Sequence, residues 1–271
     1  MTIMHLGKPI ALGRTAEIYA WKDGYVIKLF RDWMTAASVE YEARVARAVH
    51  TAGLPVPAVG EVVEVNGCLG LVYEQVEGMS MLETFRMKPW MLFRFARLLA
   101  RLHADMHACT VPELPSQRRR LEDRIRETEG LSTDVKGAVL KALDEITDDD
   151  RLCHGDFHPD NILMTTEGPI IIDWMDATSG NPSLDVARTS LLLSMGALPL
   201  GTPAPARWLM EAMRHWFHMA YLRHYFQLRP SGRQQPTAWQ SVIAAARLGE
   251  NITEERDRLI ALVKAGLSQY G

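Results

Sequence analysis

The chain has 271 residues, of which 47% are hydrophobic and 23% are charged, proportions typical of a soluble globular protein. Its 30 lysines and arginines against 33 aspartates and glutamates give a formal net charge of -3, so it lacks the basic field of a nucleic-acid-binding protein. The length suits one large domain or two lobes.

Compartment and membrane association are predicted from simple sequence features. The beginning of the chain lacks the basic stretch and apolar core of a signal peptide, and no apolar run is as long as a membrane span. The three cysteines, Cys68, Cys109 and Cys153, are widely spaced and odd in number, which is typical of reduced thiols. We therefore expect a cytoplasmic protein without nucleic-acid or membrane partners, whose oligomeric state the sequence does not define.

The first elements are predicted to be strands. Residues 16–21 and 25–30 are rich in strand-forming residues, and Asp23-Gly24 between them is a typical hairpin turn. Alternation along the second strand places Val26, Lys28 and Phe30 on one face. Lys28 is thus a lone charge in an otherwise apolar strand.

A helix and two further strands complete the first part of the chain. Apolar residues recur at helical spacing over 36–52, and the proline at position 55 ends that pattern. Strands are expected over 61–65 and 68–74, joined at Asn66-Gly67. We predict a small five-stranded sheet with one helix for this part of the chain.

The rest of the chain is mainly helical by its pattern. Helices are expected over 90–107, 117–128 and 133–146, a short strand pair ends in Ile170–Trp174, and helical pattern resumes at Pro182. The sequence predicts an N-terminal nucleotide-binding lobe over 1–76 and a C-terminal catalytic and substrate-binding lobe over 77–271. Ligand sites are often found in clefts between such lobes.

The stretch HGDFHPDN, residues 154–161, is unusually dense in polar groups. Its alternating His154, Asp156 and His158 could bind zinc, and His103 and His107 form a second pair at helical spacing. Because no third histidine cluster accompanies them, a metallohydrolase is the minor interpretation.

Phosphoryl transfer explains more of the sequence. It requires a carboxylate near the attacking hydroxyl, metal ligands and a cation on the phosphates. Asp156 and Asn161 have the spacing of a base and a metal ligand on one loop, Asp173 follows a short strand, and Lys28 precedes a helix carrying Glu42. These residues occur in the required order and on the required types of element.

The chain resembles the aminoglycoside phosphotransferase and choline kinase group of small-molecule kinases up to about residue 188. The resemblance rests on HGDFHPDN (154–161), IIDW (171–174), VIKLF (26–30), YEARVARAVHTAGLPVP (41–57) and LARLHA (99–104). It implies an α+β, bilobal protein-kinase-like fold.

By this resemblance, Asp156 is the catalytic base, and Asn161 and Asp173 bind Mg²⁺. Lys28 contacts the α- and β-phosphates and pairs with Glu42, which we prefer to its rival Glu40.

The resemblance also implies contacts to the nucleotide, with two departures from protein kinases. Backbone groups of Glu74 and Val76 would bind the purine of ATP or GTP. The phosphate loop, LGRTAEIY (12–19), has the single glycine Gly13 where protein kinases have three, so Arg14 or Thr15 would contribute side chains. No platform for a protein substrate follows Asp173, which favours a small-molecule acceptor.

Several other residues have simpler interpretations. His154 is expected to bond backbone near Asp173, His103 and His107 to be packed helix residues, and Asp185 to brace the catalytic loop or cap a helix. Core packing is favoured over an aromatic cage for the C-terminal aromatics. These are Trp208, Trp216, Phe217, Tyr221, Tyr225 and Phe226.

The sequence thus predicts a Mg²⁺-dependent kinase that transfers the γ-phosphate of ATP or GTP to a hydroxyl of a small molecule, such as an aminoglycoside or another antibiotic. A metabolite kinase of the choline, fructosamine or sugar type and a non-catalytic nucleotide-binding protein remain alternatives. A polycationic acceptor needs carboxylates, yet residues 199–236 carry five arginines against Glu211 alone. The acids available near the cleft are Asp160, Asp176, Glu250, Glu254 and Glu255.

Overall fold

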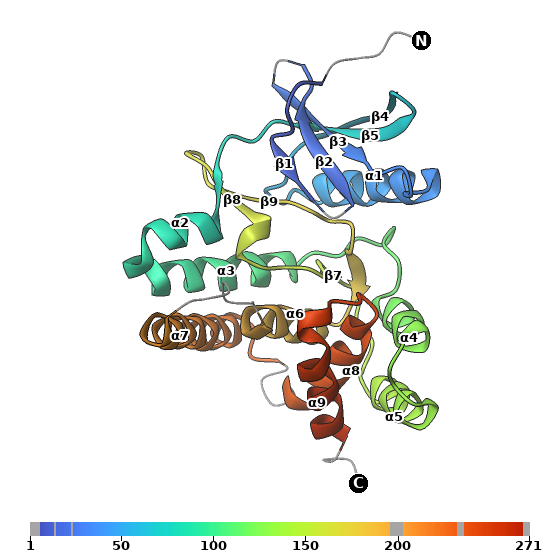
Figure 1. Ribbon diagram of the computed structural model, residues 1–271, viewed down its shortest axis with the longest axis vertical. Coiled ribbons are helices and arrows are strands. Elements are labelled where there is room, and N and C mark those ends of the chain that lie inside the picture. The colour runs from blue at the N-terminus through green and yellow to red at the C-terminus, as the bar shows by residue number, and fades with distance from the viewer. Residues whose placement is uncertain (1–5, 14, 23, 196–202, 232–235, 268–271) are drawn as a thin grey trace. The chain divides into compact units, whose positions relative to one another are not determined.

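A computed structural model describes residues 6–13, 15–22, 24–195, 203–231 and 236–267 (Figure 1). The chain divides into two compact units. The first comprises Met1–Thr84 and Asp160–Asp176, and the second comprises Phe85–Pro159 and Ala177–Gly271. The first unit is therefore discontinuous in sequence.

The first unit contains the expected five-stranded sheet, with the strand order β1-β2-β3-β5-β4 and every neighbouring pair antiparallel. The turn between β4 and β5 contains Asn66 and Gly67, both at positive φ, which asparagine and glycine tolerate well. The strands are β1 (Ala11–Leu12), β2 (Ala16–Ala20), β3 (Tyr25–Phe30), β4 (Val59–Val65) and β5 (Cys68–Glu74).

Helix α1 (Ala36–Thr51) packs against β4 and β5. It begins after Thr35, whose side chain accepts a hydrogen bond from the backbone N–H of Ser38. Its inward face joins Phe30 and Leu71 from the sheet in a small core. This packing orients the residues of α1 that face β3.

A second, smaller sheet belongs to the same unit although its strands are distant in sequence. Its order is β6-β8-β9, formed by β6 (Met79–Ser80), β8 (Ile162–Met164) and β9 (Pro169–Ile171). Strand β9 ends two residues before Asp173, earlier than the strand end we expected from the sequence. The indole N–H of Trp174 instead donates to the Ile171 carbonyl at 3.2 Å, so the chain turns here.

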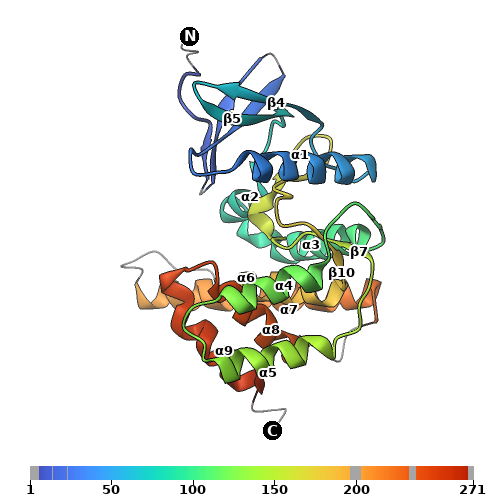
Figure 2. The ribbon, with the colours of Figure 1, turned by 90° about the vertical axis from the view of Figure 1, so that its right-hand side faces the viewer.

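The second unit is mainly helical, with α8 (Pro236–Leu248) at its centre. Helix α8 packs against α4 (Gln117–Glu127), α5 (Thr133–Asp144), α6 (Pro182–Met195) and α9 (Arg256–Leu267), as Figure 2 shows. The residues of α8 from Val242 to Ala246 are almost completely buried.

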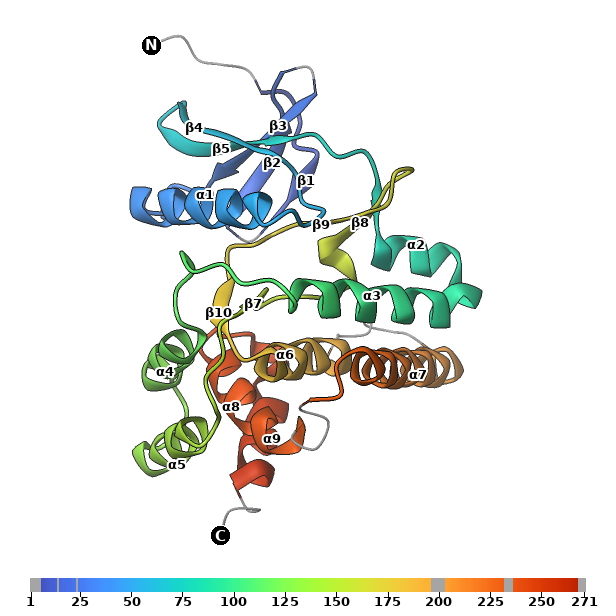
Figure 3. The same cartoon turned by 180° about the vertical axis from the view of Figure 1, so that it is seen from behind.

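Two further helices and a short strand pair complete the second unit. Helix α3 (Leu92–Met106) packs along α7 (Ala204–Leu228), and β7 (Arg151–Cys153) pairs with β10 (Thr178–Gly180) (Figure 3). The remaining short elements are α2 (Met81–Met87), η1 (Pro89–Met91), η2 (Pro159–Asn161) and η3 (Thr253–Glu255). Among the described residues, no helix is both long and apolar enough to cross a membrane.

The aromatic residues of α7 are only partly core residues. Phe217, Tyr221 and Tyr225 are buried, as core packing predicts, but Trp208 and Trp216 are 70% and 53% exposed. The prediction was wrong for these two tryptophans because only one side of this 25-residue helix faces α3 and α6.

Candidate active site

An ion pair joins β3 to α1 in the first unit. The Nζ of Lys28 lies 2.6 Å from Oε1 of Glu42, which is 1% exposed and also accepts a hydrogen bond from the Tyr73 hydroxyl at 3.1 Å. The expected Lys28–Glu42 contact is thereby confirmed. Glu40 is exposed, because it lies on the outward side of α1.

Lys28 also binds a second carboxylate, since its Nζ lies 3.1 Å from Oδ1 of Asp173. Burial alone would lower the pKa of the Lys28 ammonium group, but the charges of Asp173 and Glu42 outweigh it and the pKa is raised. Lys28 is therefore a fixed cation held between a buried carboxylate and one whose side chain is 47% exposed.

Asp173 has a backbone conformation that few residues adopt. Its φ is +63°, in the left-handed region, where aspartate and asparagine are tolerated better than most side chains. Outliers of this kind often occur at functional sites. The conformation arises where the chain leaves β9.

Asn161 lies beside this turn. The backbone N–H of Ile172 donates to the Asn161 carbonyl at 3.0 Å, which continues the antiparallel register of Ile162 with Ile171. Asn161 and Asp173 therefore emerge at the same end of the β8–β9 hairpin. One amide oxygen and one carboxylate are hard oxygen ligands of the kind that Mg²⁺ prefers.

Asp156 belongs to the second unit. It follows β7 in a loop where Gly155 has a φ of +79°. Glycine adopts this left-handed conformation much more readily than other residues. His154 is completely buried, and its Nδ1 accepts a hydrogen bond from the Asp156 backbone N–H at 3.2 Å. His154 is thus structural, although its expected bond to backbone near Asp173 stays a prediction.

One face of α6 holds the loop that contains Asp156. The carboxylate of Asp185 accepts the backbone N–H of His154 at 2.7 Å and that of Gly155 at 2.8 Å. Nε of Arg188 donates to the Gly155 carbonyl at 3.1 Å, and the Thr189 hydroxyl donates to the carbonyl of residue 157 at 2.8 Å. The expected bracing role of Asp185 is confirmed, whereas the sequence did not identify Arg188 or Thr189.

The carboxylate of Asp156 is partly buried between two cationic or potentially cationic groups. Nη2 of Arg188 lies 3.5 Å from its Oδ1, and Nε2 of His158 lies 3.4 Å from its Oδ2. Burial acts to raise the pKa of Asp156, but the His158 contact and the Arg188 charge dominate and lower it below its ordinary value. Asp156 is therefore ionised at neutral pH.

Arg188 also connects this loop to the C-terminal helices. Its Nη2 lies 2.5 Å from Oε1 of Glu250, and Arg247 contacts Oε2 of Glu250 at 3.0 Å. Arg247 in turn binds Glu255 through two hydrogen bonds of 2.5 and 2.9 Å. Two of the acids that the sequence offered for a cationic acceptor are thus engaged by internal arginines.

The predicted nucleotide contacts lie at two places on the first unit. Gly13 is exposed and its backbone N–H donates to the Ala16 carbonyl at 2.9 Å, while Thr15 is half-buried. Arg14 lies outside the described residues. Glu74 ends β5 and Val76 follows it.

The predicted site residues are divided between the units. Lys28, Glu42, Asn161 and Asp173 belong to the first unit, where the two ion pairs of Lys28 bring three of them together. Asp156 belongs to the second unit with its α6 partners. The residue roles that the resemblance implies stay predictions.

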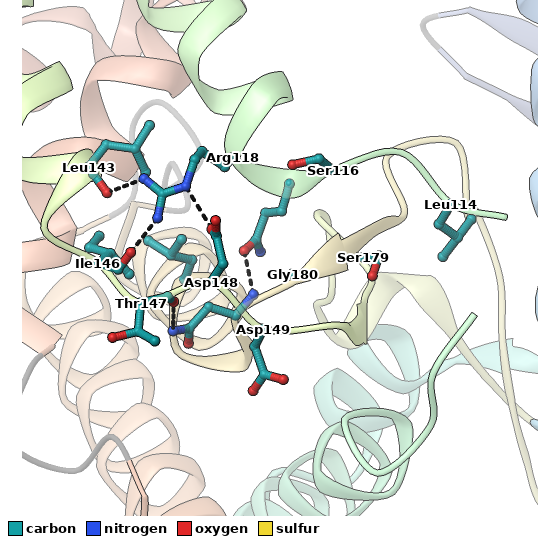
Figure 4. A pocket seen from close by; sticks show the side chains of 13 residues that line it. Leu114, Ser116, Arg118, Leu143, Ile146, Thr147, Asp148, Asp149, Ser179 and Gly180 are labelled. Atoms are coloured by element: carbon teal, nitrogen blue, oxygen red, sulfur yellow. Dashed lines mark hydrogen bonds and ion pairs between the residues drawn. The ribbon is translucent and has the colours of Figure 1, made fainter. Parts of the chain in front are cut away.

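A separate pocket of about 270 Å³ lies between α4, α5 and the beginning of α6, and none of the predicted site residues lines it (Figure 4). Arg118 donates to the Leu143 carbonyl at 2.6 Å and to Asp148 at 2.7 Å. Gln117 accepts the backbone N–H of Asn181 at 2.9 Å. These polar groups of the pocket wall therefore bind one another and link the segments that line it.

Comparison with known proteins identifies the family of the chain. Residues 7–230 match the family model described as the phosphotransferase enzyme family. No curated protein matches the chain in sequence.

Solved structures show the same fold at low sequence identity. A thermostable mutant of aminoglycoside phosphotransferase APH(4)-Ia, in a ternary complex with ADP and hygromycin B, is 15% identical with a TM-score of 0.67, over 96% of this chain and 93% of that one. A choline/ethanolamine kinase family protein from Mesorhizobium loti is 18% identical with a TM-score of 0.59, over 97% and 85%. Amicoumacin kinase hAmiN, in complex with AMP-PNP, Ca²⁺ and Ami, is 15% identical with a TM-score of 0.61, over 97% and 88%. The expected α+β protein-kinase-like fold is confirmed.

Proposed function

The chain belongs to the phosphotransferase enzyme family, and from this membership we propose that it transfers the γ-phosphate of ATP or GTP to a hydroxyl group of a small molecule. The observation that carries the proposal is the position of Lys28 between Glu42 at 2.6 Å and Asp173 at 3.1 Å. Phosphoryl transfer depends mainly on positioning and electrostatic stabilisation, and this centre supplies a fixed cation beside an accessible carboxylate.

Glu42 and Asp173 have different roles in this proposal. Glu42 is buried and orients the Lys28 ammonium group, whereas Asp173 is accessible and can exchange its contact with Lys28 for a metal ion. Lys28 then faces the α- and β-phosphates of the nucleotide. The raised pKa of Lys28 keeps it charged throughout the neutral range.

Asn161 and Asp173 fit the Mg²⁺ that this chemistry requires. Both offer oxygen ligands, and both lie at the same end of the β8–β9 hairpin. When bound, Mg²⁺ neutralises charge on the β- and γ-phosphates. The left-handed backbone at Asp173 fixes the direction in which its carboxylate leaves the hairpin.

Asp156 would orient the acceptor hydroxyl and receive its proton late in the transfer. Its lowered pKa makes it a weak base, so its main contribution is to position the hydroxyl. Asp156 can accept the proton only late in the transfer, when the attacking oxygen shares its electrons with phosphorus and the hydroxyl becomes more acidic.

The nucleotide would bind the first unit through the residues that the sequence suggested. Backbone groups of Glu74 and Val76 would contact the purine, while the loop of Gly13, Arg14 and Thr15 would cover the phosphates. Because relatives of this fold hold ADP or AMP-PNP, ATP is the nucleotide to test first, with GTP beside it.

Two observations bear on the acceptor. Relatives of this fold hold hygromycin B or Ami, which supports an antibiotic. The ion pairs of Glu250 with Arg188 and Arg247, and of Glu255 with Arg247, favour an acceptor that carries fewer positive charges than an aminoglycoside. A metabolite kinase of the choline, fructosamine or sugar type is therefore the second candidate.

The proposal is tested by coupled assays of ADP and GDP release, with Mg²⁺, against aminoglycosides, other antibiotics, choline, fructosamine and sugars. Transfer is expected to at least one hydroxyl acceptor, confirmed by mass spectrometry of the phosphorylated product, and to be lost in Asp156→Asn. If the protein binds ATP in thermal-shift measurements but phosphorylates none of the panel, a non-catalytic nucleotide-binding protein becomes the better account.

A further inference from the structure

Five buried polar side chains form a closed hydrogen-bond network in the second unit. His103 and His107 come from α3, Asp185 from α6, and Tyr221 and Tyr225 from α7. Both histidines and Asp185 are at most 1% exposed, and both tyrosines at most 2%. Buried polar groups are costly unless each is paired, so the partners of every atom can be assigned.

The distances define two parallel chains that end on one carboxylate oxygen. The Tyr221 hydroxyl lies 2.7 Å from Nδ1 of His103, whose Nε2 lies 3.2 Å from Oδ2 of Asp185. The Tyr225 hydroxyl lies 2.7 Å from Nδ1 of His107, whose Nε2 lies 3.3 Å from the same oxygen.

Only one distribution of protons satisfies all these contacts. An ionised carboxylate accepts and cannot donate, so both Nε2 atoms must carry hydrogens. Burial lowers the pKa of His103 to about 3 and lowers that of His107, so both rings are neutral and their Nδ1 atoms are acceptors. The two tyrosine hydroxyls must then donate.

Asp185 connects this hydrogen-bond network to the loop that contains Asp156. Its two oxygens accept the backbone N–H groups of His154 and Gly155, immediately before Asp156. The His103 ring also packs on Phe157, with ring centroids 4.3 Å apart. The loop is therefore held at the residues on both sides of Asp156.

We infer that Tyr221 and Tyr225 are positioning residues, whose hydroxyl groups fix His103 and His107 in the Nε2–H tautomer and thereby hold Asp185 and the loop of Asp156 in place. The inference rests on the proposed function only where Asp156 is taken to be the catalytic group. Without a tyrosine hydroxyl, the Nδ1 atom would lie buried without a donor, and its histidine could adopt the other tautomer. That tautomer would turn an Nε2 lone pair toward the carboxylate.

A buried metal ion is the competing account, because two histidines and an aspartate can bind zinc. It would need the opposite tautomer, with Nε2 bound to the ion and Nδ1–H donating to tyrosine. The hydrogen bonds already account for all four ring nitrogens and both Asp185 oxygens. Because every one of these atoms already has a hydrogen-bond partner, a hydrogen-bonded network is favoured over a metal site.

The first experiment measures tautomers and needs no activity. Long-range ¹H–¹⁵N spectra of the full chain should show Nε2–H in both His103 and His107, and metal analysis should find no stoichiometric zinc. In Tyr225→Phe, His107 should lose the uniform Nε2–H state, and amide exchange at Gly155 should rise by about tenfold, since a buried hydrogen bond is lost. Nδ1–H signals with one bound zinc, or unchanged exchange in Tyr225→Phe, would overturn the inference.

The second experiment measures catalysis. Tyr225→Phe should lower kcat by about tenfold while KM for nucleotide and acceptor changes less than twofold, because the variant displaces the loop and removes no substrate contact. Trp216→Phe, on the exposed side of the same helix, is the matched control and should retain kcat. A lower melting temperature with unchanged kcat would show that Tyr225 is merely structural. If the wild-type protein transfers no phosphate, the proposed function fails, and the tautomer and exchange measurements still decide the positioning role.

Discussion

The guanidinium group of Arg188 lies 3.5 Å from the carboxylate of Asp156. Arg188 is also 2.5 Å from Glu250, in the loop that follows α8, and its side chain is only 7% exposed. A single buried cation therefore joins the loop that we expect to be catalytic to the C-terminal helices.

Replacement of Arg188 by methionine should raise the pKa of Asp156, since it removes a cation that lowers this pKa. The native Asp156 stays ionised well below its ordinary pKa, so it should impose no acidic limb on kcat above about pH 5. In Arg188→Met the acidic limb should move to higher pH. Profiles of kcat from pH 4 to 9 measure this shift, and Arg223→Met, at an exposed position of α7, is the control. Identical profiles in the wild type and Arg188→Met would contradict the prediction.

Asp156→Asn should lower kcat by about a hundred- to ten-thousand-fold, the usual contribution of a general base, with near-native nucleotide affinity. The substitution keeps the side-chain shape and removes the charge. Steady-state kinetics and calorimetric titration with nucleotide separate the two effects. A kcat within fivefold of wild type would exclude Asp156 as the catalytic carboxylate.

Asp173→Asn is a sharper test of the metal ligand than Asp173→Ala. The φ of +63° at this position suits asparagine and strains alanine, so Asn should preserve the hairpin and remove only the charge. Transfer should fall by about a hundredfold or more even at high Mg²⁺, while the melting temperature stays near that of the wild type. Full activity restored by excess Mg²⁺ would show that Asp173 only modulates metal affinity.

Lys28→Met should cost roughly 3 kcal/mol of unfolding free energy, because it leaves the carboxylate of Glu42 buried without its cation. The double variant Lys28→Met/Glu42→Gln should regain most of this stability, since the buried charge is gone, yet should remain inactive. Urea unfolding and phosphoryl-transfer assays of the single and double variants give both quantities. A double variant as unstable as the single one would show that Glu42 is not the cause.

Stability should fall as the pH is lowered from about 6.5 toward 4.5. His103 is neutral in the folded protein, with its pKa lowered to about 3, whereas the unfolded chain takes up a proton near pH 6.5. The unfolded state thus binds more protons in this window, so each such histidine removes up to about 1.4 kcal/mol per pH unit. Asp185, whose pKa is lowered, loses its stabilising effect only below about pH 4. Urea unfolding at pH 7, 5.5 and 4.5 tests the sign; constant stability would contradict it.

The ion pair of Lys28 and Glu42 was predicted from the strand pattern together with the resemblance to small-molecule kinases, which implies a lysine held by a helix glutamate. Strand alternation makes Lys28 an isolated charge, and its order before a helix with Glu42 suggests the partner. Strand β3 begins and ends at the predicted residues. The left-handed conformation of Asp173 could not be predicted from the sequence, because it depends on where the hairpin ends.

Residues of the second unit were harder to assign, because their roles depend on packing between distant helices. Arg188 and Thr189 follow Asp185 at positions i+3 and i+4 of α6, a spacing that is visible in the sequence. The sequence does not show that these residues hold a loop some thirty residues earlier in the chain. Strands of two or three residues, such as β6, β7 and β10, are too short for a periodic pattern to predict.

The discontinuity of the first unit limits how such a protein could have arisen and diverged. Its β8–β9 hairpin is encoded between two segments of the helical unit, and β6 pairs with β8 across more than eighty residues of sequence. A recombination event that exchanged only the gene segment for residues 1–84 would bring in a sheet whose partner hairpin, with Asn161 and Asp173, still came from the recipient gene. A recombination that replaces the first unit therefore has to preserve the β6–β8 pairing. Inheritance of the whole gene without internal recombination is the simplest way to preserve it.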